Sequence, residues 1–479
     1  MIAARLWTTR AMAEAMHASQ AGALPETVTG LSIDSRTIAP GEAYFAIKGD
    51  VHDGHDFVLA ALKAGAALAV VAASRRGEFP QDAPLLLVDD VLDGLRSLAR
   101  AARARLTAQV IAVTGSVGKT STKEALRSVL AAQGEAHAST ASFNNHWGVP
   151  LSLARCPATA RFAIFEIGMN HAGEIEPLVK LVRPHIAIIT AVEPVHLEFF
   201  AGIQAIADAK AEIFAGVEPG GAVVLNRDNS QFARLQAAAE RQGISRIVTF
   251  GTDARSEARL LDLSLHATSS AVHANILGHQ VTYKLGVPGR HMVMNSLAVL
   301  AAASLAGADL ALAALSMSQV EPASGRGVRR LLELAGGEAT LIDESYNANP
   351  ASMAAALEVL GQAAVAQHGR RIAVLGDMLE LGPTAAGLHQ SLGEVIKANR
   401  IDLVYCCGPL MRNLWDTLSA GKRGGYADDS AGLEGQVVSA VRAGDVLMIK
   451  GSLGSKMKII VNALERGFPG RSARDGAAG

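Results

Sequence analysis

The stretch 109–124, QVIAVTGSVGKTSTKE, decides the fold. It contains an apolar run of strand length, a turn with two glycines, and then a lysine and a threonine where a helix begins. This is the layout of a loop that binds the phosphates of a nucleotide between a strand and a helix. The common pattern G-x-x-x-x-G-K-[ST] places its first glycine where this chain has Val113, so the loop is a shortened form.

The residue types in this loop suit an anion. Glycines let backbone N–H groups turn toward a phosphate, and the following helix adds the positive end of its dipole. We expect Lys119 to reach the β- and γ-phosphates and Thr120 to hold Mg²⁺. The predicted nucleotide contacts of the loop are Gly115, Ser116, Gly118, Lys119, Thr120 and Ser121.

Apolar runs of strand length alternate with helical segments along the rest of the chain, which predicts mainly parallel sheets buried on both faces. We expect an α/β protein of three domains. These are a small α/β domain at 1–88, a central domain at 89–324 whose mainly parallel sheet carries the phosphate loop, and a third α/β domain at 325–479, where the alternation of strands and helices restarts. Residues 256–286 indicate antiparallel strands, and the last ten residues indicate a frayed tail.

Composition excludes several classes of function. The chain has 44 Lys and Arg against 45 Asp and Glu, so no basic surface for nucleic acid is indicated. Three cysteines, two of them adjacent, form neither a disulfide framework nor a zinc pattern, which favours a reducing cytoplasm. The N-terminus lacks the apolar core of a signal peptide. The apolar run 296–317 is interrupted at Gly307 and Asp309, so we expect two buried helices and no membrane insertion.

Three further residues lie where they could take part in catalysis or metal binding, although each could instead have an ordinary structural role. Glu166 is near the carboxyl end of an apolar strand, where either Mg²⁺ or a capped acid in the core explains it equally well. His196 follows the next strand, and a histidine there is by itself more often structural. Lys210 lies on a predicted helix, where a lysine is usually solvated.

The order and spacing of many motifs resemble the ATP-dependent Mur ligases of peptidoglycan synthesis. The short loop T-G-S-x-G-K-T is typical of that family, and the motifs extend over all three predicted domains. They are TGSVGKTSTKE at 114–124, FEIGMNHAGEI at 165–175, HLE at 196–198, KAEIF at 210–214, PGRHMVMN at 288–295, DESYNANPASM at 343–353, VLGDMLELG at 374–382 and KGSLGSKM at 450–457. SYNANPASM, LGDMLELG, SFNNHWGVPLSL at 142–153 and DSRTIAPGEAYFAIKG at 34–49 are most similar to the family member that adds D-Ala-D-Ala.

The resemblance implies a reaction and its participants. ATP, UDP-MurNAc-tripeptide and D-Ala-D-Ala would give UDP-MurNAc-pentapeptide, ADP and phosphate through an acyl phosphate. The first domain would bind the UDP end, the central domain of the phosphate-loop type would be the ATPase, and the third would be Rossmann-like and would close over the reaction. A bacterial cytoplasmic monomer is expected, with two Mg²⁺ sites.

The resemblance also assigns roles to individual positions. Thr120 and Glu166 would hold one Mg²⁺ and His196 a second, beside Lys210, which matches a lysine that the family carbamylates. The catalytic group would be Lys119, Glu166, His196, Lys210 and Asn347. Nucleotide contacts outside the loop would come from His291, Asn295, Arg326 and Asp343. Substrate contacts would come from Ser35, Arg36, Lys48, Asp53, Gly54, His55, Asn144, Asn145, Tyr346, Lys450 and Ser452.

Taken alone, several of these residues have simpler explanations. DSRT and DGHDF are ordinary turn sequences, and Asn295 and Asn347 are equally suited to cap helices or turns. His389 is expected to be structural.

The chain also departs from the family pattern. Leu453 stands where an arginine is usual, and Lys456 would replace that charge only if its loop bends back. Glu344 stands for a second aspartate, Met292 for a frequent asparagine, and ITAVEP for an asparagine-containing turn before His196. The alternative interpretations are another ligase of the same fold, such as the Mur ligase that adds the third amino acid or folylpolyglutamate synthase, or a nucleotide switch without ligation. Whether the third residue of the peptide is diaminopimelate or lysine is not readable from the sequence.

Overall fold

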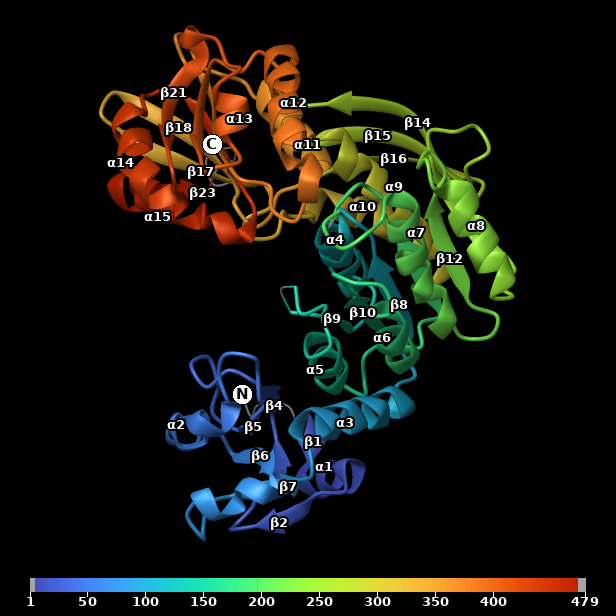
Figure 1. Cartoon of the computed structure of the whole chain (residues 1–479). Coiled ribbons are helices and arrows are strands. Elements are labelled where there is room, and N and C mark those ends of the chain that lie inside the picture. Colours follow the sequence, from blue (N-terminus) through green and yellow to red (C-terminus); the bar gives the residue numbers. More distant parts are fainter. Residues whose placement is uncertain (1–4, 141, 196, 473–479) are drawn as a thin grey trace.

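The computed structural model describes residues 5–140, 142–195 and 197–472, which form three lobes, each built around one sheet (Figure 1). The lobes follow one another along the chain in the predicted order. The predicted α/β class with mainly parallel sheets is therefore confirmed. The divisions after residues 88 and 324 stay a prediction.

The N-terminal lobe contains a five-stranded sheet in the order β2-β7-β6-β5-β4. Neighbouring strands are parallel except for β2 and β7. The strands are β2 (Ser19–Ala21), β4 (Gly30–Ser32), β5 (Glu42–Phe45), β6 (Leu68–Ala72) and β7 (Leu85–Val88), with helices α1 (Thr9–Met16) and α2 (Val58–Lys63) and a separate antiparallel pair, β1 (Trp7–Thr8) and β3 (Thr27–Val28).

Helix α3 (Val91–Arg105) leads from this lobe into the middle one (Figure 1). Asp90 caps it, because its carboxylate accepts the N–H of Asp93 at 2.8 Å. The helix packs against α1 and against α5 (Gly148–Ala154) of the middle lobe. Its buried residues Leu95 and Leu98 lie in a core that both lobes share, so burial of apolar surface holds the two lobes together.

The middle lobe contains a nine-stranded sheet in the order β16-β15-β14-β13-β12-β11-β8-β10-β9. Strands are parallel from β9 to β14, whereas β14, β15 and β16 are antiparallel as predicted for 256–286. The strands are β8 (Gln109–Thr114), β9 (Ala136–Ala138), β10 (Phe162–Glu166), β11 (Ile186–Ile189), β12 (Ala222–Asn226), β13 (Arg246–Gly251), β14 (Ala258–Leu265), β15 (Ser270–Ile276) and β16 (His279–Leu285). The remaining helices are α4 (Lys119–Ala131), α6 (Ile175–Val182), α7 (Ile203–Ala211), α8 (Phe232–Arg241), α9 (Arg290–Leu305) and α10 (Leu310–Ser316).

The apolar run at 296–317 forms parts of α9 and α10, as predicted. Gly307 adopts a φ of +75° in the turn between them, and Asp309 caps α10. No helix in the described part of the chain has both the length and the apolar character needed to cross a membrane.

The C-terminal lobe contains a seven-stranded sheet in the order β21-β20-β19-β22-β18-β17-β23. Strands β21 to β18 are parallel, and β17 and β23 extend the sheet with antiparallel pairing. The strands are β17 (Val328–Leu334), β18 (Gly337–Glu344), β19 (Arg371–Gly376), β20 (Leu403–Cys407), β21 (Arg423–Ala427), β22 (Val446–Lys450) and β23 (Gly470–Ser472), and the helices are α11 (Pro350–Gln362), α12 (Ala385–Ala398), α13 (Arg412–Trp415), α14 (Ser430–Ala440) and α15 (Lys458–Gly467).

The prediction of a frayed tail was wrong for its first three residues. Gly470–Ser472 pair with Arg330–Leu332 of β17, because the edge of that sheet offers unpaired backbone groups. Residues 473–479 lie outside the described residues.

Candidate functional site

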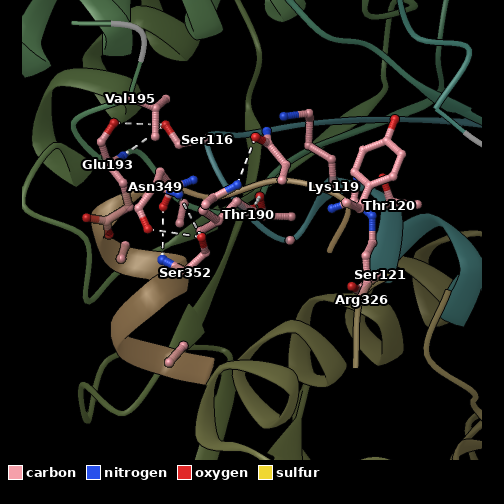
Figure 2. Close-up of a pocket in the computed structure, with 18 of the residues that line it drawn as sticks. Ser116, Lys119, Thr120, Ser121, Thr190, Glu193, Val195, Arg326, Asn349 and Ser352 are labelled. Atoms are coloured by element: carbon pink, nitrogen blue, oxygen red, sulfur yellow. Dashed lines mark hydrogen bonds between the residues drawn. The ribbon is translucent and has the colours of Figure 1, made fainter. Parts of the chain in front are cut away.

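A cleft of about 600 Å³ lies between the middle and C-terminal lobes. The middle lobe contributes the phosphate loop and residues at the carboxyl ends of β10, β11 and β12, which is where open parallel sheets bind ligands. The C-terminal lobe contributes residues 325–326, the segment from Glu344 to α11, and the loop after β22. Figure 2 shows Ser116, Lys119, Thr120 and Ser121 in this cleft with Arg326, Asn349 and Ser352 of the other lobe.

The phosphate loop has the backbone that its glycines predicted. Gly118 adopts a φ of +84° immediately before α4, and a Cβ there would lie 2.8 Å from Nδ2 of Asn295. Gly115 has a φ of +151°, and a Cβ there would lie 2.0 Å from Oγ1 of Thr190. Lys119 donates from Nζ to the carbonyl oxygen of Gly115 at 2.7 Å. The loop is therefore packed closely against α9 and against the end of β11.

Glu166 ends β10 with a side chain that is 1% exposed. Its Oε2 accepts from Oγ1 of Thr120 at 2.8 Å, and its Oε1 accepts from Nδ2 of Asn144 at 2.7 Å. In the described part of the chain it forms no ion pair with a lysine or arginine. A buried carboxylate beside a hydroxyl oxygen fits a hard divalent cation such as Mg²⁺.

Two predicted lysines of the middle lobe differ in position, because Lys119 lines the cleft and Lys210 does not. Lys119 is half-buried, and burial lowers the pKa of its ammonium while the charge of Glu166 raises it. Lys210 on α7 is 2% exposed. Burial, and then the positive charge of Lys119, hold the pKa of Lys210 well below its ordinary range. The sequence alone favoured a solvated Lys210, and the structure contradicts that interpretation.

The C-terminal wall of the cleft is built from charged and amide groups. Arg326 lies 4.2 Å from the centre of the Tyr346 ring and donates to Oγ of Ser142 at 3.4 Å, so it reaches across to the middle lobe. Lys450, at the end of β22, donates to Oε2 of Glu344 at 3.2 Å and to the carbonyl oxygen of Asn347 at 2.9 Å. Glu344 therefore keeps a charged partner, although it replaces an expected aspartate.

The structure places most of the predicted nucleotide and peptide residues on the cleft. The predicted residues that line it are Ser116, Gly118, Lys119, Thr120, Ser121, Asn144, Glu166, His291, Asn295, Arg326, Tyr346, Asn347, Lys450 and Ser452. Met292 and Leu453, two of the departures from the family pattern, also line it, and the Leu453 side chain is 66% exposed. His196 lies outside the described residues.

Two predicted residues are engaged elsewhere. Asp343 is buried and pairs with Nζ of Lys458 at 2.8 Å, while Ser345 donates its hydroxyl to the same carboxylate at 2.6 Å. Asn145 accepts the N–H of Gly148 at 2.9 Å at the start of α5. Neither lines the cleft, so a ribose contact by Asp343 and a peptide contact by Asn145 stay predictions.

The predicted uridine-site residues lie in the N-terminal lobe, away from the cleft lining. Ser35 and Lys48 lie on loops next to β4 and β5, and Lys48 forms a backbone bridge with Asp53. Arg36 pairs with Asp34 at 2.7 Å. These residues are Ser35, Arg36, Lys48, Asp53, Gly54 and His55.

The DGHDF segment in this lobe is held by charge. Asp53 Oδ1 lies 2.6 Å from Nδ1 of His55, and Nη1 of Arg75 donates to Oδ2 at 2.9 Å. Burial raises the pKa of Asp53, but the hydrogen bonds from His55 and Arg75 outweigh it and bring the pKa to about 2. The segment is thus a rigid, charged turn rather than a loose loop.

His389 is structural, as predicted. It is fully buried in α12, where Nε2 accepts the N–H of Met378 at 2.9 Å and Nδ1 lies 2.7 Å from the carbonyl oxygen of Ala385.

Several residues that line the cleft were not among the site residues predicted from the sequence. Thr190 and Asn226 lie at the carboxyl ends of β11 and β12, a position that the strand predictions could have signalled. The others lie on turns or caps, where polar residues are too common to stand out. The missed residues are Ser142, Thr190, Glu193, Asn226, Asn349 and Ser352.

Comparison with known proteins agrees with this architecture. The family model of the Mur ligase middle domain matches residues 113–303, that of the Mur ligase, glutamate ligase domain matches 329–453, and that of the Mur ligase family, catalytic domain matches 27–103. The UDP-N-acetylmuramoyl-tripeptide--D-alanyl-D-alanine ligase of Bacillus subtilis (strain 168) is 31% identical, with 91% of this chain and 93% of the relative covered. The protein of that name from Escherichia coli (strain K12) is 31% identical, with 92% and 94% covered.

This chain belongs to the Mur ligase family.

Solved structures share the whole fold of this Mur ligase. A crystal structure of MurF from Acinetobacter baumannii has a TM-score of 0.80 at 28% identity and covers 96% of this chain and 99% of its own. The MurF ligase of Thermotoga maritima in complex with ADP has a TM-score of 0.74 at 24% identity, with 91% and 97% covered, and supports the fold alone. The family resemblance that rested on the motifs is therefore confirmed.

Proposed function

We propose that this Mur ligase joins D-Ala-D-Ala to UDP-MurNAc-tripeptide at the expense of ATP, giving UDP-MurNAc-pentapeptide, ADP and phosphate. One observation carries the proposal. The phosphate loop, with Lys119 and Thr120, shares a single cleft with Arg326 and Lys450 of the C-terminal lobe. The names and coverage of the relatives support the choice of substrates.

The charges of the cleft suit phosphoryl transfer to a carboxylate. Two anions, the triphosphate of ATP and the peptide carboxylate, must approach each other, and the positive charges of Lys119 and Arg326 reduce their repulsion. Transfer of the γ-phosphoryl group would convert the carboxylate into an acyl phosphate with a good leaving group. The amine of D-Ala-D-Ala then attacks the acyl carbon, and phosphate departs.

The donor set of the cleft supports Mg²⁺ as a cofactor. Thr120 and Glu166 would hold one ion, with His196 and Lys210 near a second, and Mg²⁺ would supply further positive charge at the phosphates. A lysine held as the neutral amine by burial can react with CO₂, which supports carbamylation of Lys210. A carbamate would then offer oxygens where an ammonium group would repel the ion.

The remaining assignments follow from the same proposal. The N-terminal lobe, with its rigid turn at Asp53, Gly54 and His55, would bind the UDP end of the substrate. His291 and Asn295 would contact adenine, and Tyr346 and Asn347 would complete the site. We place the enzyme in the bacterial cytoplasm as a monomer, which suits its buried, unpaired cysteines.

A coupled assay of ADP release tests the proposed function. ADP should form only when ATP, UDP-MurNAc-tripeptide and D-Ala-D-Ala are all present, and a panel of acceptor dipeptides and UDP-peptides should show which pair is preferred. Equal hydrolysis of ATP without the dipeptide would contradict ligation and favour a nucleotide switch.

A further inference from the structure

Glu193 is a cleft residue to which neither the motifs nor the proposed chemistry gives a task. It follows β11, and its backbone is tied to the phosphate loop. Its N–H donates to Oγ of Ser116 at 3.0 Å, and that hydroxyl oxygen also lies 3.0 Å from the carbonyl oxygen of Glu193. Ser116 in turn donates its N–H to the carbonyl oxygen of Ala191 at 2.8 Å. The position of Glu193 relative to the phosphate loop is therefore fixed.

The carboxylate of Glu193 differs from the other acidic side chains of the cleft. Glu166 is bound by Thr120 and Asn144, and Glu344 pairs with Lys450. Glu380 lies on the exposed rim. Within the described residues, by contrast, the carboxylate of Glu193 accepts no hydrogen bond and joins no ion pair, although the residue is only partly exposed.

A carboxylate beside a phosphate loop is unfavourable unless a cation comes to it, because it repels the triphosphate. Ligation brings such a cation, since the acceptor amine arrives as an ammonium group. That nitrogen cannot attack until it loses a proton. Figure 2 shows Glu193 beside Ser116 in the cleft. Asn349 and Ser352, at the start of α11 in the C-terminal lobe, line the same cleft, so Glu193 lies between the two lobes.

We propose that Glu193 binds the α-ammonium group of the acceptor dipeptide and accepts the proton that this nitrogen must lose before it attacks. The inference rests on the proposed function. The proton passes from nitrogen to a carboxylate oxygen of Glu193, and the freed electron pair forms the C–N bond to the acyl carbon. The C–O bond to phosphate then breaks, its electrons leave with phosphate, and the second proton of the nitrogen leaves with them.

The environment of Glu193 suits this role. Burial raises the pKa of its carboxyl group above the ordinary range, which makes it a stronger base than a solvated glutamate. A raised carboxyl pKa also sets a direction for pH dependence. The group is protonated and cannot act below that pKa, so the rate with the dipeptide should rise as pH increases through it.

The test compares two acceptors in the parent enzyme, in E193Q and in the matched control E240Q, whose glutamate is exposed on α8. D-Ala-D-Ala arrives protonated, whereas hydroxylamine is already uncharged near neutral pH and traps the acyl phosphate as a hydroxamate. In E193Q, kcat/KM for the dipeptide should fall by about 10²–10⁴-fold, the usual contribution of a general base. Hydroxamate formation should be unchanged, the acid limb of the pH profile should disappear, and E240Q should match the parent.

Three results would overturn the role of Glu193. One is an undiminished kcat/KM for the dipeptide in E193Q. Another is an equal loss with both acceptors, which would place the residue in phosphoryl transfer. The last is a raised Mg²⁺ requirement with an unchanged dependence on dipeptide, which would make Glu193 a metal ligand. Failure of the parent enzyme to form any hydroxamate would instead contradict the proposed function itself.

Discussion

Lys119 is the residue on which the chemistry of the cleft depends most directly. Its Nζ bonds to Gly115 within the loop and lies near both Glu166 and Arg326, whose charges act on its pKa in opposite directions. The hydrogen bond to Gly115 therefore fixes the position of the Lys119 side chain within the loop. A single positive group held in this way stabilises charge that develops on a transferring phosphoryl group.

Replacing Lys119 by alanine should reduce kcat by about 10²–10³-fold, the usual cost of removing one preorganised charge-stabilising group. The fold should persist, because other hydrogen bonds hold the loop backbone: Oγ1 of Thr190 donates to the carbonyl oxygen of Val117 at 2.5 Å, and the N–H of Ser116 donates to that of Ala191 at 2.8 Å. ADP release in the complete assay, with circular dichroism to confirm folding, measures the effect. Lys180→Ala, an exposed residue of α6, is the control. Full activity of K119A would remove the loop from the mechanism.

Lys210 leads to a different prediction, because it is buried beside another cation. If its carbamate supplies oxygens to Mg²⁺, Lys210→Ala should lose most activity and regain part of it when short carboxylic acids are added. The same acids should not restore K119A, which lacks a positive charge. A titration of formate or acetate against the rate of ADP release gives the answer, and an inactive K210A at every acid concentration would count against carbamylation.

Site residues that lie within a sequence motif could be predicted from the sequence. Site residues whose role depends on contacts with distant parts of the chain could not. Lys119 and Thr120 lie within one motif, so their roles were readable. Burial of Lys210 depends on packing of α7 into the core of the middle lobe, and a helical lysine is usually solvated, so the interpretation from this residue alone was wrong. Glu193 follows β11 by a few residues, yet nothing local shows that its turn is bonded to Ser116, 77 residues away in sequence.

Among the elements, the phosphate loop and α4 show how backbone geometry constrains the site. Gly118 has a φ of +84° and Asn295 directly beside it, whereas Gly220, in the turn before β12, has a φ of +77° and no atom within 4 Å of the place that a Cβ would take. Any L-residue at either position must adopt the left-handed region, at a cost of about 1–2 kcal/mol. Only at Gly118 must a neighbouring group, the side-chain amide of Asn295, also move aside.

A comparison of these two glycines distinguishes the effect of backbone strain on stability from an effect on catalysis. Gly118→Ala and Gly220→Ala should lower the free energy of unfolding to a similar extent, but only Gly118→Ala should lower kcat/KM for ATP. The reduction should be about 10²-fold, because displacement of a positioned group by about 1 Å has an effect of that size. Denaturant titrations and initial rates on both variants test this. Equal ATP kinetics would show that the contact with Asn295 is not needed.

Strand and helix predictions succeeded where an apolar run is continuous and buried on both faces, as in β8, β10 and β11. They missed β17 and β21, since β17 carries Arg329 and Arg330 and β21 contains two glycines. Such strands are defined by the strands they pair with and not by their composition, which is why strands at the edge of a sheet, or next to it, are hard to predict from sequence. The start of α11 was likewise hidden, although Asn349 and Ser352 form a capping box there.

At the scale of the molecule, the N-terminal and middle lobes share an apolar core, and polar contacts also link the lobes. Arg155 of the middle lobe donates from Nε to the carbonyl oxygen of Leu31 in the N-terminal lobe at 2.7 Å. Glu198 donates its N–H to the carbonyl oxygen of Glu380 in the C-terminal lobe at 3.3 Å, and Arg326 reaches Ser142. Within the described residues, no apolar core spans the middle and C-terminal lobes, so a ligand bound in the cleft should add to the few polar contacts that hold these two lobes together.

Nucleotide binding should therefore stabilise the whole molecule, and Arg326 should carry part of that effect. A ligand at 100 times its Kd stabilises the folded state by about 2.7 kcal/mol. Loss of one hydrogen bond to a charged group costs about 1.5–3 kcal/mol of binding free energy. The rise in Tm produced by a non-hydrolysable ATP analogue with Mg²⁺ should thus be much smaller in Arg326→Ala than in the parent. Arg330→Ala is the matched control, because Arg330 is exposed and pairs with Glu465 at 2.8 Å, away from the cleft. If R326A and R330A gained equally from the analogue, Arg326 would not contact the nucleotide, and the cleft would not join the two lobes through ATP.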